Sequence, residues 1–237
     1  MGGGTGEELD RIRELRHRGL TPKQIARAVG LPPSRVTPLV RKIAAAETVD
    51  PTQRPVVECW VSPGWNTGLT VTGHPEWPAE PDEDEAGSGL VGVLLAREAG
   101  RDRVSVCAWL VDVYCLGVKN DLGPDVVYRS ALPGIVHDFF AIFRERPVAA
   151  PLELAQHLVL GAVEYARSLG FEPAAEADFA DTRGHLGSWE GPSAICFGRH
   201  GKPFYVSGPH DHPARVLGQL ERSVGRGNFD YMTGLPE

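Results

Sequence analysis

Four chemically versatile side chains lie where a long apolar segment ends. Residues 104–116 read VSVCAWLVDVYCL, and Asp112, Tyr114, Cys115 and Lys119 lie in or just after the last part of this segment. A carboxylate, a phenol, a thiol and an amine offer both donors and acceptors, and binding sites are often built where strands give way to loops. We therefore predict a ligand site at these four residues.

Cys115 could also act as a nucleophile if a histidine, such as His157 or His185, removed its proton. Nothing in the sequence brings a histidine to this thiol, so a buried structural cysteine is the reading that we favour. The four cysteines are far apart and form no CxxC pair, which argues against a disulfide or a cysteine-bound metal.

His210, Asp211 and His212 could ligate a metal, but such residues directly before a helix more often cap it. The remaining histidines show no ligand spacing, and the chain has no GxxxxGK[ST], GxGxxG, HExxH or GxSxG motif. The sequence thus predicts neither a metal nor a cofactor.

The charge of the chain is unevenly distributed. Residues 7–45 carry nine Lys or Arg against four Asp or Glu, a net charge of +5, whereas the whole chain has −7, which leaves −12 for the rest. A basic segment beside an acidic remainder is typical of a nucleic-acid-binding unit joined to a domain of another role.

The elements that position these residues follow from hydropathy patterns. Linker and turn residues in ETVDPTQRP divide the chain into domains at residues 1–50 and 51–237. The patterns predict strands at 56–61, 90–96 and 104–116, helices at 132–144, 152–169 and about 212–224, a hairpin turn around 199–201, and an exposed acidic loop at 76–89. Strands and helices without regular alternation indicate an α+β fold.

The basic segment contains signals for three short helices. Thr21, Pro22 and Gln24 form a capping box with proline in the first turn, and Gly30 can stop that helix in the left-handed conformation. A preceding helix ends at Gly19. Apolar residues recur at helical spacing through the whole segment: Leu9, Ile12, Leu15, Ile25, Val29, Leu31, Val36, Leu39, Val40 and Ile43.

This pattern resembles the helix-turn-helix family of DNA-binding proteins, and VTPLVRKI is similar to recognition helices of MarR-type winged-helix regulators. The positions that define the unit are Ile25, Ala26, Val29, Gly30, Leu31, Val36 and Leu39. The resemblance implies an N-terminal three-helix helix-turn-helix unit followed by a larger mixed α+β domain. It covers about a sixth of the chain, and only Arg54 follows where a winged member would have a basic hairpin.

The resemblance also implies which residues contact DNA. Ser34, Thr37 and Arg41 would contact bases or phosphates, Arg35 and Lys42 would bind phosphate, and we add Lys23 as a further basic contact. Pro38 removes a backbone amide inside this helix, which should therefore kink or start late.

Together these observations predict a cytoplasmic transcriptional regulator that binds double-stranded DNA as a homo-oligomer, without a membrane span. Its acidic domain, in which GHLGSWEGPS and FGRHGKPFYVSGP resemble segments of uncharacterised bacterial proteins, would dimerise or bind a small-molecule or protein effector. The alternatives are an enzyme acting on nucleic acid or a small molecule, and a protein-interaction factor.

Overall fold

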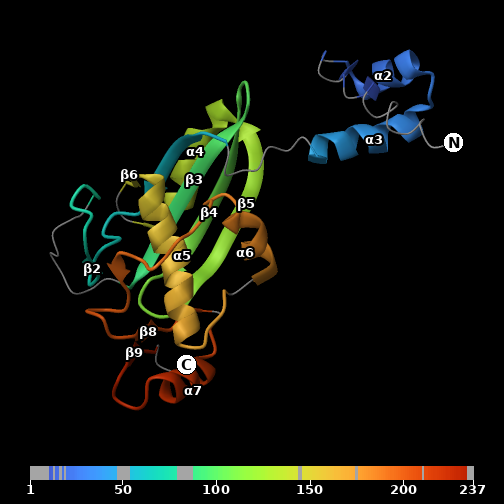
Figure 1. Ribbon diagram of the computed structural model, residues 1–237. Coiled ribbons are helices and arrows are strands. Elements are labelled where there is room, and N and C mark those ends of the chain that lie inside the picture. Colours follow the sequence, from blue (N-terminus) through green and yellow to red (C-terminus); the bar gives the residue numbers. More distant parts are fainter. Residues whose placement is uncertain are drawn as a thin grey trace. The chain divides into compact units, whose positions relative to one another are not determined.

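The computed structural model describes residues 11–12, 14–15, 18, 20–46, 54–78, 88–143, 146–173, 176–209 and 211–233, without the side chains of residues 38, 41–46 and 176–178. The chain divides into two compact units, Met1–Gln53 and Arg54–Glu237, and Figure 1 labels most of their helices and strands. The predicted boundary after residue 50 and residues 79–87 of the predicted acidic loop lie outside the described residues.

The first unit contains α2 (Pro22–Val29) and α3 (Pro33–Ala46). The predicted capping box is confirmed: the Thr21 side chain accepts a hydrogen bond from the Gln24 amide, and the Thr21 amide donates to Gln24 Oε1 at 2.9 Å. Gly30 ends α2 with a φ of 71°, and its amide donates to the Ala26 carbonyl. The sharp turn between the helices is therefore encoded by a few adjacent residues.

A small apolar core joins these helices. Ile12, Ile25, Ala26 and Val36 are buried, and Leu15, Leu20, Val29, Leu31, Leu39 and Val40 pack around them. Of the predicted first helix, Arg11, Ile12, Glu14 and Leu15 are described, and all four are helical. Of the two effects expected from Pro38, a late start is wrong: α3 begins at Pro33, and the Pro32 carbonyl accepts the amides of Arg35 and Val36. The other effect, a kink, stays a prediction.

The second unit is α+β. Its sheet contains β1 (Val56–Val61), β3 (Leu90–Gly100), β4 (Arg103–Asp112), β5 (Gly117–Tyr128) and β6 (Val148–Ala149). Their order in the sheet is β5-β4-β3-β1-β6, and all neighbours are antiparallel. The three strands β3, β4 and β5 follow each other through tight turns, so β4 lies inside the sheet.

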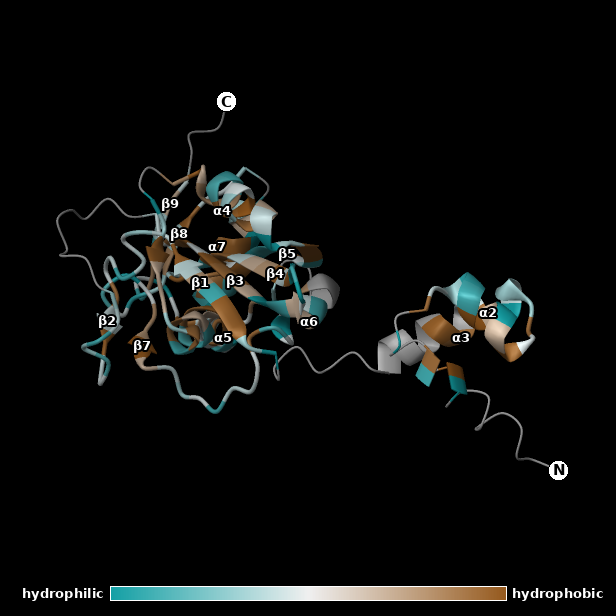
Figure 2. Cartoon of the chain, turned by 90° about the horizontal axis from the view of Figure 1, so that it is seen from above, coloured by the Kyte–Doolittle hydropathy of each residue, from teal (hydrophilic) through white to brown (hydrophobic). Residues whose placement is uncertain are grey.

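Helices cover both faces of this sheet. α5 (Leu152–Ser168) packs on one face with Cys107, Trp109 and Val111, whereas α4 (Leu132–Phe140) packs on the other with Val106 and Ala108. Figure 2 shows α4 and α5 on opposite sides of the hydrophobic strands. Alternate residues of β4 thus enter different cores, as predicted for a strand buried on both faces. The predicted end at residue 116 is wrong, because β4 ends at Asp112 and residues 113–116 form a turn.

Two elements differ from the predicted pattern. β5 was not predicted, because it is an edge strand whose residues from Lys119 onward are mostly polar or exposed. α6 (Glu176–Arg183) was not predicted either; in its last turns Phe179 and Thr182 are buried, and Thr182 accepts a hydrogen bond from the Trp109 indole at 3.1 Å.

The predicted hairpin is also corrected. The turn is present, since His200 and Gly201 have φ values of 52° and 79°, but only Arg199 and Lys202 bridge across it. The flanking strand β7 (Ile195–Cys196) pairs with β2 (Thr70–Val71), and β8 (Phe204–Val206) pairs in parallel with β9 (Asp230–Met232). α7 (Pro213–Ser223) lies between β8 and β9 in the chain.

Candidate functional site

Asp112 is the last residue of β4 and shapes the turn that follows. Its Oδ1 accepts hydrogen bonds from the amides of Tyr114 at 2.9 Å and Cys115 at 3.0 Å. An aspartate that receives the amides two and three residues later holds a tight turn by local hydrogen bonds. Asp112 is only 5% exposed, so the carboxylate is at once a structural cap and a buried charged group.

Lys119 lies on β5, close to the loop that precedes α7. Its Nζ donates to both oxygens of Asp211 at 2.8 Å, and this ion pair is largely shielded from solvent. Asp211 Oδ2 also accepts the Gly208 amide at 2.8 Å and the Tyr205 hydroxyl at 3.3 Å. Gly208 allows this approach, because a Cβ there would lie 3.1 Å from Lys119 Nζ.

A pocket of about 630 Å³ opens beside Asp112 and this ion pair. It is bordered by the segment before β3, by β3, β4, β5 and β8, and by the loop after β8: Ser88, Leu90, Leu110, Asp112, Lys119, Asn120, Val206, Ser207, Gly208, Pro209 and Asp211. Apolar walls with a few polar groups, in a cavity of this size, are typical of sites for small molecules. The pocket is therefore the candidate ligand site of this unit.

The charges in the pocket are nearly balanced. Burial raises the pKa of Asp112 to about 6, against the opposing effects of the Tyr114 amide and the Lys119 charge. Burial also works to raise the pKa of Asp211, but the hydrogen bonds from Lys119 and the Gly208 amide outweigh it and lower that pKa. Since Asp211 already neutralises Lys119, Asp112 is the group that favours a hydrogen-bond donor or a cation in a ligand.

The structure brings two of the four predicted ligand residues into this pocket and places the other two elsewhere. Asp112 and Lys119 border it, whereas Tyr114 and Cys115 do not. Tyr114 is 1% exposed and donates its hydroxyl to the Thr67 carbonyl at 2.7 Å, which ties down the 64–69 loop. It has a packing role that the sequence pattern did not reveal.

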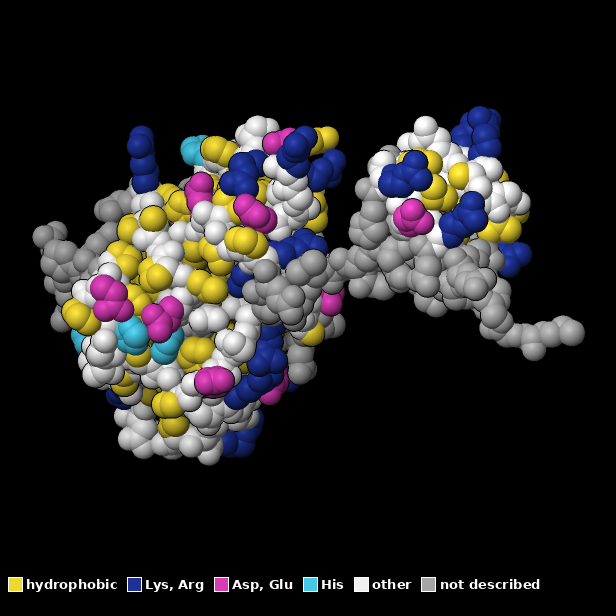
Figure 3. Space-filling view, turned by 45° about the horizontal axis from the view of Figure 1, so that its top comes forward, with side chains coloured by type: hydrophobic (Ala, Val, Ile, Leu, Met, Phe, Trp, Pro, Cys, Tyr) yellow, Lys and Arg dark blue, Asp and Glu magenta, His cyan; other side chains and the backbone are white. Residues whose placement is uncertain are grey.

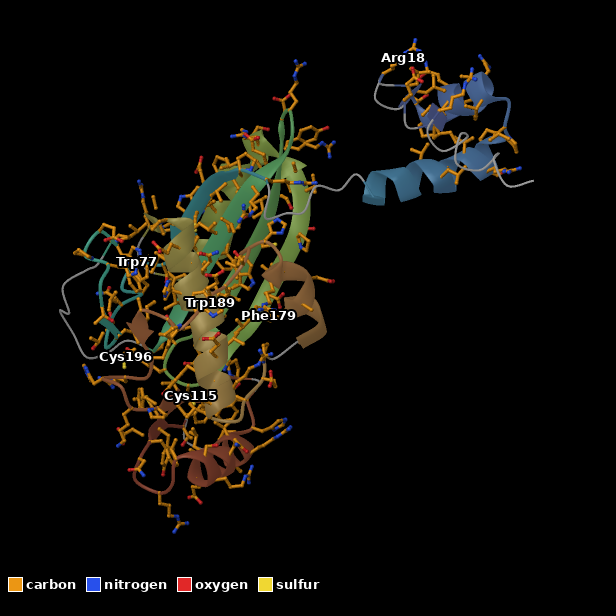
Figure 4. The ribbon with its side chains drawn as sticks, in the orientation of Figure 1. Arg18, Trp77, Cys115, Phe179, Trp189 and Cys196 are labelled. Carbon is orange, nitrogen blue, oxygen red and sulfur yellow. The ribbon has the colours of Figure 1, made fainter. Side chains whose placement is uncertain are left out.

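Cys115 lies in a separate apolar cluster with Leu169, Tyr205, Leu220 and Phe229, and Figure 4 labels it. Its side chain is fully buried, and burial raises the pKa of its thiol far above the usual range.

The two histidines considered as its base are engaged elsewhere, because His157 Nδ1 accepts the Ala194 amide and His185 Nε2 lies 2.8 Å from Ser105 Oγ. These positions favour the structural cysteine over the nucleophile.

Asp211 is the site residue that sequence reasoning placed wrongly. We expected residues 210–212 to cap the helix, but Asp211 binds Lys119, and His212 at the N-cap of α7 makes no side-chain capping bond. His210 lies outside the described residues. The partners in the ion pair are 92 residues apart, a distance at which no local pattern operates.

The predicted DNA contacts lie on α2 and α3. Lys23, Ser34 and Arg35 are exposed, and Thr37 is half-buried, whereas the side chains of Arg41 and Lys42 lie outside those that the structure describes. The opposite sides of both helices form the apolar core with Ile25 and Val36. The exposed side therefore combines hydroxyl and basic groups on a compact two-helix frame.

The chain has no significant match among family models, curated proteins or solved structures. The features that indicate a function are the pocket at Asp112 and the exposed side of α2 and α3. In the part of the chain that the structure describes, no helix is both long and apolar enough to cross a membrane.

The raised pKa of Asp112 makes the stability of the second unit depend on pH. The folded state binds the proton of the Asp112 carboxyl more tightly than the unfolded state, in which this carboxyl has a pKa near 3.8. The protonated Asp112 therefore stabilises the fold fully below pH 3.8, and this stabilisation is lost as the pH rises through 6.

Relative to wild type, Asp112→Asn should therefore gain up to about 3 kcal/mol in unfolding free energy between pH 3.5 and pH 7.5. Urea unfolding at both pH values measures this, and a constant difference between the two proteins would contradict it.

Proposed function

We propose that this protein is a DNA-binding transcriptional regulator, in which residues 1–50 form a three-helix helix-turn-helix unit that contacts double-stranded DNA. The observation that carries the proposal is the α2–α3 pair, with its capping box, its left-handed Gly30 and its core of Ile25, Ala26 and Val36. These are the features through which the sequence resembles helix-turn-helix proteins. In this proposal Lys23, Ser34 and Arg35 belong to the DNA-facing side.

Titration of labelled genomic duplex fragments with the full chain, followed by fluorescence anisotropy, tests the proposal. The basic segment predicts binding that weakens steeply between low and physiological salt, because phosphate contacts release counterions. Binding to a protein partner that is insensitive to salt would instead support the protein-interaction alternative. The absence of DNA binding at low salt would overturn the proposal.

We further propose that the regulator acts as a homodimer, since one helix-turn-helix unit buries little DNA surface and such units commonly bind paired half-sites. The surface that favours a second copy combines exposed apolar residues of β5 with α4: Leu122 and Val126 are 54% and 51% exposed beside a groove that Ile135 and Phe139 also line.

Light scattering should give twice the mass of the chain, and Val126→Glu should shift it toward the monomer. Tyr231→Glu, at an exposed aromatic residue on β9, is the matched control. A monomeric wild-type chain would exclude this arrangement.

The pocket at Asp112 and Lys119 supports an effector role for the second unit. Its size and its apolar walls suit a small amphipathic molecule whose donor or cationic group binds Asp112. A thermal-shift survey of small amphipathic amines should find compounds that stabilise the wild type but not Leu110→Trp, which fills the pocket. Leu122→Trp places the same ring on the exposed edge strand as a control, and equal shifts in both variants would contradict an effector at this place.

A further inference from the structure

Three potential metal ligands converge on the surface of the second unit, away from the pocket described above. His74 follows β2, and Glu153 and His157 lie one turn apart on α5. One ligand atom from each of these residues lies within 4.8 Å of the other two. Figure 3 shows histidine and acidic side chains gathered on one part of this surface.

The two segments that carry these residues are fastened to the same short stretch of chain. The Thr72 amide and hydroxyl both donate to the Ala194 carbonyl, at 3.0 and 3.1 Å, and the Ala194 amide donates to His157 Nδ1 at 2.8 Å. The Ala194 carbonyl thus holds the loop that carries His74, and the Ala194 amide holds the His157 ring. The convergence is part of the hydrogen-bonded frame of the unit.

Aromatic side chains fix the orientation of both imidazoles. The His74 ring stacks on the Trp77 indole with centroids 4.1 Å apart and planes within 13°. The His157 ring meets Trp77 at 5.1 Å and Trp189 at 4.9 Å, in both cases edge to face. Figure 4 labels both tryptophans, and Trp77 itself is only 3% exposed. A binding site whose ligands are already oriented loses less entropy when it takes up an ion.

The charge of the cluster also favours a cation. His74 Nδ1 lies 2.9 Å from Glu76 Oε1 and 3.9 Å from Glu153 Oε2, so it stands between two carboxylates. Among the described residues, neither Glu76 nor Glu153 pairs with a lysine or an arginine. A divalent ion bound at this place would bring positive charge next to both carboxylates.

We propose that His74, Glu153 and His157 bind a divalent transition metal of the zinc type, with Glu76 beside the site as a fourth ligand or as the partner of His74. Two imidazoles and one carboxylate are ligands that zinc accepts readily, whereas magnesium and calcium prefer oxygen alone. Ligand atoms on one tetrahedral zinc lie roughly 3.4 Å apart at ordinary bond lengths. The ligand atoms of the three residues now lie within 4.8 Å of one another, so ion binding requires small side-chain rotations that shorten these distances.

Metal binding at His157 requires a change of tautomer, which limits the expected affinity for the ion. His157 Nδ1 already accepts the Ala194 amide, so Nε2 is the nitrogen left for the metal and must give up its proton. The remaining ring proton then sits on Nδ1, where Ser193 Oγ at 3.2 Å is an acceptor already in place. Because the Ala194 amide loses this hydrogen-bond partner, we expect weaker binding than at a site whose hydrogen bonds all remain intact.

Calorimetric titration of the full, tag-free and chelator-treated chain with Zn²⁺ tests the proposal, and Co²⁺ absorption reports the coordination geometry. The titration uses a Cys196→Ser background, because Cys196 is exposed whereas Cys59, Cys107 and Cys115 are buried. We expect one equivalent of Zn²⁺ and a tetrahedral Co²⁺ spectrum. His157→Gln should abolish both, and Glu153→Gln, at a largely exposed side chain, should weaken binding by more than about tenfold without unfolding the chain.

His137→Gln, at an exposed histidine on α4, should bind like the parent protein. Failure of the parent chain to take up Zn²⁺ would overturn the proposal, as would equal binding by the folded Glu153→Gln and His137→Gln variants.

Discussion

Simultaneous replacement of Arg35, Arg41 and Lys42 by alanine is expected to weaken DNA binding by about 100-fold or more at physiological salt. All three belong to α3 in the basic segment, and each phosphate contact that is removed also removes one counterion-release step. The plot of log K against log salt should therefore become shallower by about 2 to 3. Fluorescence anisotropy at several salt concentrations measures both quantities.

A matched control separates local contact from the overall charge of the chain. Arg101, Arg183 and Arg215 are exposed residues of the acidic second unit, and their replacement by alanine removes the same three charges. This control should retain nearly the affinity and the salt slope of the wild type. Equal losses in both triple variants would show that binding depends on net charge, and would remove the support for α3 as the DNA-contacting helix.

Gly89→Ala is expected to destabilise the second unit by about 3 kcal/mol. Gly89 has a φ of 73°, and a Cβ at this position would lie 2.2 Å from the Tyr114 ring. Tyr114 cannot easily move away, since its hydroxyl is bonded to Thr67 and the ring is 1% exposed. The variant must therefore bear backbone strain and displace a packed aromatic ring, and urea unfolding followed by tryptophan fluorescence measures the sum.

Gly73→Ala distinguishes these two contributions. Gly73 has a similar φ of 80°, but a Cβ there would meet no atom within 4 Å. It should lose only about 1 kcal/mol, the ordinary penalty for a left-handed residue with a side chain. Equal losses for the two variants would mean that the Tyr114 ring yields easily, contrary to the packing role that we assign to it.

Much of the local structure could be predicted because its determinants lie close together in the chain. Thr21 and Gln24 cap α2 across three residues, and Gly30 ends the helix by its own backbone conformation. The nearly continuous apolar run in β4 likewise identifies a strand with two buried faces. Edge strand β5 gives no such signal, because a strand that faces solvent does not need the apolar pattern by which strands are recognised.

The candidate sites depend on contacts between segments that lie far apart in the chain. Asp112 could be recognised as a polar residue at a strand end, but its pocket depends on the pairing of Lys119 with Asp211, 92 residues later. The spacing of histidines along the chain gives no indication that His74 lies beside Glu153 and His157.

The sequence by itself determined the caps of α2, the buried strands, the α+β class and the uneven charge, because backbone geometry and hydropathy act over a few residues. Only the tertiary structure decided which buried polar groups face a pocket, which ones hold a turn, and which histidines meet, because such contacts depend on how distant segments pack.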